Sequence, residues 1–176
     1  MDCHLAATLK SLHRSLLVIG YGNPLRCDDG VGQEVARQIA AWELPNVEAI
    51  AVHQLTPELV ELLAKVDIAI FIDAYPATAD QEIQVRPLKP AGSGMTSGHW
   101  CEPQVLLAMT QALYGAHPQA WWVMVPGVDF ELGDSLSPIA KQGIESALQR
   151  FSIMCGTGFL LDAVLSEASN KKLPFI

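Results

Sequence analysis

The stretch SLLVIGYGNPLRCDDGVGQEVARQIA, residues 15–40, holds one complete strand–loop–helix unit. Its apolar run, 16–22, ends in glycine, which is typical of a strand buried on both faces of a sheet. From Val31 the apolar positions recur every four residues, which predicts one buried face of a helix that begins near Asp28 or Asp29. Two adjacent carboxylates make the intervening loop a poor phosphate cradle, so they need another explanation.

The same alternation of strand and helix patterns continues along the chain. Further strands are expected at 47–53, 68–73, 82–88 and 120–125, and helices at 56–66, around 103–113 and from 137. The segment 82–88 alternates apolar and polar residues and contains a proline, as an edge strand does. Elements of these lengths predict an α/β fold, a three-layer sandwich whose mainly parallel, twisted sheet of about five strands carries helices on both faces.

Length and composition indicate one domain. A chain of 176 residues, half of them hydrophobic, is long enough to bury roughly 70% of its unfolded surface. We expect a single domain over 1–176, with its core at about 15–150 and with 1–14 and 152–176 peripheral. Each element spends its one apolar face on the core, which favours a monomer.

Charge and hydropathy exclude several kinds of partner. The chain has 11 Lys and Arg against 19 Asp and Glu, a formal charge of −8, and its basic residues form no stripe. This argues against nucleic acids and anionic membranes as partners. The longest apolar runs are far too short to span a membrane, and the N-terminus lacks a signal-peptide core. The sequence therefore predicts a cytoplasmic protein, whose four scattered cysteines stay reduced thiols.

The residues directly after the strands are the candidates for function, because ligands of such sheets bind outside the carboxyl ends of the strands. Asp28 and Asp29 follow the first strand, Asp73 ends the third, and His99 lies in the long loop before the next helix. A dinucleotide site is not expected, because Leu25 stands where G-x-G-x-x-G needs its third glycine. No organic cofactor is therefore predicted.

Two separate carboxylates and a histidine above one sheet edge would make a metal site with oxygen and imidazole ligands and an open side. A structural interpretation remains open. Asp28 or Asp29 would cap the first helix, Asp73 would accept hydrogen bonds from loop amides, and His99 would be structural.

The motif GYGNPLRCDDGVG (20–32) closely resembles the signature of the hydrogenase maturation proteases, endopeptidases that trim the C-terminus of nickel–iron hydrogenase large subunits. FIDAY (71–75) and SGHW (97–100) follow in the family's order, and the resemblance covers roughly 15–150. HQLTPEL (53–59) is similar to the branch that serves bidirectional, NAD-linked hydrogenases. Some members of the family carry Glu where this chain has Asp29.

The resemblance implies that Asp29, Asp73 and His99 are both the metal-binding and the catalytic residues. The metal would be nickel carried by the substrate, a hydrogenase large subunit precursor. Asp28 would then cap the helix and so fix where Asp29 points. Gly22 would take a positive φ to turn the chain. The carboxylates beside Cys27 work against a thiolate nucleophile, and Cys101 is expected to be a packed thiol.

Two other functions remain open at this point. A non-enzymatic nickel chaperone would use the same three ligands without shortening its client. A general metallopeptidase would bind its own catalytic zinc, but the chain lacks the helix motif H-E-x-x-H.

Overall fold

The computed structural model describes residues 14–77, 82–92 and 102–156. It contains a five-stranded sheet in the order β2-β1-β3-β5-β4. The strands are β1 (Leu16–Tyr21), β2 (Val47–Val52), β3 (Ile68–Pro76), β4 (Gln84–Leu88) and β5 (Gln119–Gly127). All neighbouring pairs are parallel except β4 and β5, which are antiparallel. The predicted α/β sandwich, and the edge position of 82–88, are confirmed.

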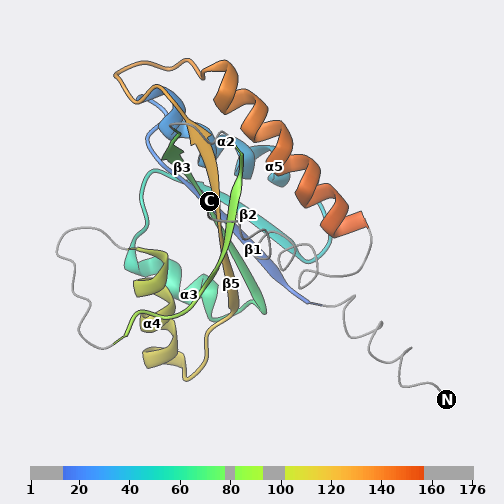
Figure 1. The fold of residues 1–176 in the computed structure, drawn as a ribbon. Helices are drawn as coiled ribbons and strands as arrows, with labels where there is room; N and C mark the ends of the chain where they lie inside the picture. Colours follow the sequence, from blue (N-terminus) through green and yellow to red (C-terminus); the bar gives the residue numbers. More distant parts are fainter. Residues whose placement is uncertain (1–13, 78–81, 93–101, 157–176) are drawn as a thin grey trace, which may run out of the picture.

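Helices cover both faces of the sheet (Figure 1). On one face lie α2 (Val31–Ala40) and α5 (Pro138–Gly156), and on the other lie α3 (Val60–Leu63) and α4 (Pro103–Tyr114). Short 3-10 turns, η1 (Cys27–Gly30) and η2 (Pro57–Leu59), lead into α2 and α3. The helix predicted over 56–66 is thus a 3-10 turn followed by a single turn of α-helix. Within the described ranges, no helix is both long and apolar enough to cross a membrane.

Strand periodicity divides the core into two layers. Side chains such as Val18, Ile70 and Val125 pack toward α2 and α5, whereas Leu17 and Phe71 pack in the layer beneath α3 and α4. Neighbouring residues of a strand point to opposite faces of the sheet. The position of a strand's last residue therefore decides on which face its side chain lies.

The first helix lies directly against the first strand. A Cβ on Gly20 would come within 1.8 Å of the carbonyl oxygen of Gly32, so two glycines permit this contact. The close approach fixes the start of α2, and with it the preceding η1 turn, above the carboxyl end of β1. That turn contains both Asp28 and Asp29.

Candidate functional site

Two predicted site residues and a tyrosine meet at the carboxyl edge of the sheet. The register pairs Gly20 of β1 with Ile72 of β3, so Tyr21 and Asp73 follow side by side. Tyr21 packs against the layer beneath α3 and α4, and Asp73 is two residues beyond Phe71 of that same layer. Both side chains therefore project from the same face of the sheet.

Asp73 is a partly buried carboxyl group with a strongly altered acidity. Its pKa is raised to about 6, mainly by burial; hydrogen bonds from the Tyr21 hydroxyl and the Ala74 amide lower the pKa, and the nearby charge of Asp29 raises it. The Ala74 amide donates to Oδ1 over 2.8 Å. Asp29 lies in the η1 turn after β1, the strand that pairs with β3, so the two predicted carboxylates lie at the same edge of the sheet.

Asp29 is held by the tight loop that follows β1. Its Oδ2 accepts a hydrogen bond of 2.7 Å from the amide of Asn23. Gly22 has a φ of +132°, and a Cβ there would lie 1.9 Å from the backbone oxygen of Asp29. The predicted positive φ of Gly22 is confirmed, and the structure adds that this glycine also makes room for the backbone of Asp29.

Asp28 does not cap the first helix, which corrects the sequence prediction. Neither η1 nor α2 has a side-chain cap. The Asp28 carboxylate is instead fully buried and accepts hydrogen bonds from the amides of Val128 (2.8 Å), Asp129 (3.0 Å) and Ser137 (2.7 Å). The Ser137 hydroxyl donates a fourth, over 2.8 Å. Asp28 therefore fixes the loop between β5 and α5 rather than a helix terminus.

Tyr21 and Trp122 are two polar residues of this region that the sequence analysis did not single out. Burial, and then the negative charge of Asp73, raise the pKa of the Tyr21 hydroxyl far above its usual value, so it is a neutral donor. The nearby indole N–H of Trp122 lowers the pKa of this hydroxyl. It is buried and makes no hydrogen bond of normal geometry within the described part of the chain. The Tyr21 hydroxyl contributes to the environment of the Asp73 carboxylate together with the Ala74 amide.

The remaining predicted ligand cannot be placed. His99, like Cys101, lies outside the described residues. Among residues 14–77, 82–92 and 102–156, no three His, Cys, Asp or Glu side chains gather closely enough to hold a metal ion. Asp29 and Asp73 lie within the described residues, and the assignment of Asp29, Asp73 and His99 as the three metal ligands stays a prediction.

Cys27 is a buried free thiol. It has a φ of +47°, which is uncommon for a residue with a side chain. A Cβ on Gly133 would lie 2.7 Å from its Sγ, so the thiol packs against the β5–α5 loop. This packing agrees with the expectation of a structural cysteine.

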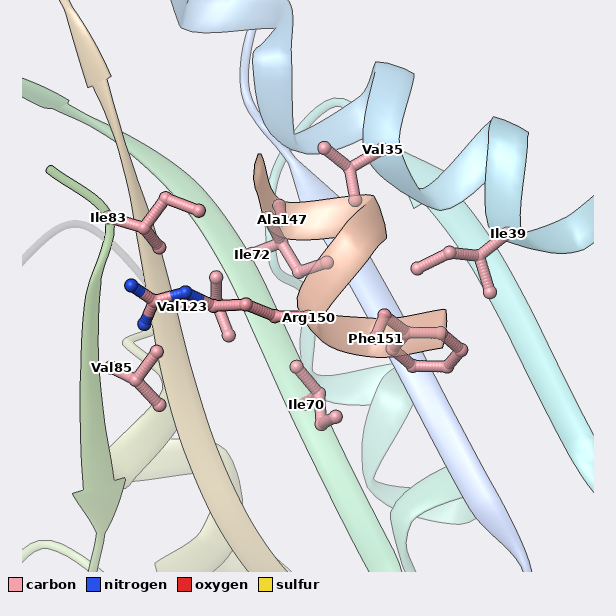
Figure 2. Close-up of a pocket in the computed structure, with 10 residues that line it drawn as sticks. All are labelled: Val35, Ile39, Ile70, Ile72, Ile83, Val85, Val123, Ala147, Arg150 and Phe151. Carbon is pink, nitrogen blue, oxygen red and sulfur yellow. The ribbon is translucent and has the colours of Figure 1, made fainter. Parts of the chain in front are cut away.

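An apolar pocket lies on the opposite face of the sheet from the Asp73 carboxylate. Residues of α2, α5 and strands β3 to β5 line it, among them Val35, Ile72, Val123 and Phe151 (Figure 2). Among the described residues that line it, Arg150 alone is charged. Because Ile72 and Asp73 are neighbours on one strand, their side chains point to opposite faces. The pocket therefore does not contain the carboxylate site.

Solved structures share this fold. The chain is similar to the nickel–iron hydrogenase maturation protease HycI from Thermococcus kodakarensis, with a TM-score of 0.67 and 18% identity over 81% of this chain and 93% of that one. The hydrogenase maturating endopeptidase HybD from E. coli gives a TM-score of 0.63 and 20% identity over 81% and 93%.

A hydrogenase 2 maturation peptidase from a Thaumarchaeota archaeon gives a TM-score of 0.62 and 20% identity over 81% of this chain and 99% of that one. No protein-family model and no curated protein matches the sequence. The likeness establishes that the chain has the fold of the hydrogenase maturation proteases.

Proposed function

We propose that the protein is an endopeptidase that removes a C-terminal peptide from the nickel-loaded large subunit precursor of a nickel–iron hydrogenase. The observation that carries the proposal is the pairing of Asp29 and Asp73 at the carboxyl edge of a sheet that has the maturation-protease fold. Asp29 lies in the turn after β1, and Asp73 lies within the neighbouring strand β3.

The electrostatics of the pair favour a cation from the substrate. A half-buried carboxylate such as Asp73, whose pKa is raised chiefly by burial, gains more from an approaching divalent ion than an exposed carboxylate does. Nickel bound in the precursor would therefore be recognised by Asp29 and Asp73, with His99 as the proposed third ligand. This recognition would place the precursor's C-terminal peptide bond at the sheet edge.

The protein's own residues contribute orientation. Asn23 holds Asp29 through its backbone amide, and Tyr21 and the Ala74 amide hold Asp73. A pair fixed in this way need not reorganise when the substrate binds. Cys27 does not serve as a nucleophile in this proposal, because its thiol is packed in the interior.

The two alternative functions predict different products. A nickel chaperone would use the same carboxylates and leave its client intact, whereas a general metallopeptidase would cleave proteins that contain no nickel. The two carboxylates alone do not discriminate against the chaperone. The fold similarity to proteases favours cleavage.

Mass spectrometry of a large subunit precursor, before and after incubation with the protein, tests the proposal. We expect loss of a C-terminal peptide from nickel-loaded precursor only. The matched control is Glu48→Gln, which removes an exposed carboxylate near the start of β2, away from the carboxyl edge of the sheet, and should cleave normally. An unchanged precursor mass would contradict the protease function, and equal cleavage of nickel-free precursor would contradict the recognition of nickel.

Several finer expectations remain predictions within this function. They are the cytoplasmic location, the monomeric state, the absence of an organic cofactor and the branch that serves bidirectional, NAD-linked hydrogenases. His53, with which the motif of that branch begins, is exposed directly after β2.

A further inference from the structure

Two loops at the carboxyl edge of the sheet are joined along their backbones. The amide of Cys27 donates to the carbonyl of Gly133 over 3.0 Å, and the amide of Gly133 donates to the carbonyl of Leu25 over 2.9 Å. In addition, the amide of Asp28 donates to the carbonyl of Asp129 over 2.9 Å. The loop after β1 and the loop after β5 therefore form one structural unit.

A buried carboxylate lies at the centre of this unit. Asp28 accepts four hydrogen bonds, all from residues of the β5–α5 loop. Burying a carboxylate costs free energy that such bonds must offset, yet neither the proposed cleavage nor the capping of α2 uses this one. Its effect is to hold the two loops rigidly against each other.

These rigid loops expose large apolar side chains. Leu132 is 88% exposed, Leu25 is 63% exposed and Val128 is 48% exposed. Single exposed apolar residues are common and need no explanation, but here three occur on two loops that are bonded to each other. We call Leu25, Val128 and Leu132 the two-loop platform.

The two-loop platform is connected to the carboxylate site through Asn23. The Asn23 amide donates to Asp29, and the side-chain oxygen of the same Asn23 accepts a hydrogen bond of 3.0 Å from the amide of Leu25. One residue therefore fixes both a proposed nickel-binding carboxylate and an exposed leucine of the platform.

The charges around the two-loop platform are mainly negative. Asp129, Glu131 and Asp134 lie in the β5–α5 loop beside Val128 and Leu132, and the last two carboxylates are exposed. Arg26 is the basic residue of the two loops, and its Nε already donates to the carbonyl of Phe130 over 3.1 Å. A ligand that covers the platform should therefore be apolar at its centre and basic at its edges.

We propose that the two-loop platform is a docking surface for an apolar, basic-flanked segment of the client protein, separate from the peptide bond that is cut. This inference rests on the proposed function, which requires a folded protein as the substrate. Docking beside Asp29 would bring the client's nickel to the carboxylates and would supply affinity that two or three metal ligands do not provide. The platform residues determine binding and take no part in the chemistry.

The test replaces both leucines, Leu25→Ser with Leu132→Ser, in the full-length protein. Cleavage of nickel-loaded precursor should show a KM raised about tenfold or more and a kcat within about twofold of the unmodified protein, because binding alone is lost. Leu113→Ser is the matched control, since Leu113 is 69% exposed on α4 and lies outside the platform. Its KM should be unchanged.

A binding measurement separates this inference from the proposed function. Affinity for the precursor is measured by surface plasmon resonance with Asp29→Asn, alone and combined with the two leucine substitutions. Weaker binding in the combined variant, and a loss of affinity at higher salt, would support the docking surface even if the protein cuts nothing. Unchanged KM and unchanged affinity would overturn it. So would self-association of the unmodified protein that the leucine substitutions abolish, because the platform would then bind a second copy.

Discussion

Asp28 and Ser137, which are 109 residues apart in the sequence, are joined by two hydrogen bonds. The Ser137 amide donates to Oδ1 over 2.7 Å and the hydroxyl donates to Oδ2 over 2.8 Å. The same hydroxyl accepts a bond of 3.1 Å from the Ala140 amide in the first turn of α5. A residue of the first loop thus fixes the serine that caps the last helix.

Replacement of Asp28 should destabilise the protein by more than the loss of one helix cap. Asp28→Ala leaves three backbone amides without their acceptor, and we expect a loss of about 2–4 kcal/mol of unfolding free energy. Asp28→Asn should not rescue it, because its amide group would face donors. Urea unfolding measures both, with Asp134→Asn as the exposed control. A loss of only about 1 kcal/mol, which is typical of a lost helix cap, would contradict this prediction.

Gly22→Ala should impair both stability and cleavage. The new Cβ would meet the backbone oxygen of Asp29 at 1.9 Å, in a backbone conformation that disfavours side chains, so we expect a loss of about 2 kcal/mol or more. Gly115→Ala is the control, because its φ is +78° but nothing lies within 4 Å of the added Cβ. That variant should lose about 1 kcal/mol and cleave normally. Equal effects at the two glycines would contradict the steric argument.

Asp73→Asn should stabilise the metal-free protein at neutral pH. Burial raises the pKa of Asp73 from 3.8 to about 6, so ionisation is harder in the folded state, and stability falls as the pH rises through this interval. Removing the charge should add about 1–2 kcal/mol at about pH 8 after allowance for partial exposure, and almost nothing at about pH 4. Unfolding at both pH values measures this, and equal differences would contradict it.

Residues that act within one strand–loop–helix unit were predictable from the sequence. The glycines, Asp29 and the start of α2 are neighbours in the chain, so local rules decide their conformation. The β3 strand was predicted to end at Asp73 but continues to Pro76, because its pairing with β5 continues to Gly127. The extension depends on pairing with β5, which the local sequence of β3 does not reveal.

Residues whose partners are distant in the sequence were not predictable in the same way. Asp28 before an expected helix suggests a cap, whereas its actual partners lie about a hundred positions further on. In the sequence Tyr21 has the pattern of an ordinary strand residue, and only the β1–β3 register places it beside Asp73. The position of Tyr between two glycines at a strand end was the only local signal for it.

Cys27→Ala should leave cleavage largely intact. The thiol is buried and packs against the backbone near Gly133, so its removal should cost about 1 kcal/mol of packing. The variant combined with Cys101→Ala should behave similarly if Cys101 is a packed thiol. Thermal unfolding confirms folding, and mass spectrometry of the precursor reports cleavage. A folded double variant that cleaves nothing would indicate a cysteine nucleophile.

Asp29→Asn separates the role of its charge from the role of its shape. The amide oxygen of asparagine can still accept the hydrogen bond from the Asn23 amide, so the loop should persist and the unfolding free energy should change by less than about 1 kcal/mol. Cleavage of nickel-loaded precursor should nevertheless be lost, because a neutral amide binds a divalent ion far less well than a carboxylate. Asp73→Asn and His99→Ala should lose cleavage in the same way if the three residues engage one ion. All variants are assayed with nickel-loaded and nickel-free precursor, with Glu48→Gln as the control for removal of an exposed negative charge. Normal cleavage of loaded precursor by Asp29→Asn would mean that this carboxylate only shapes the loop.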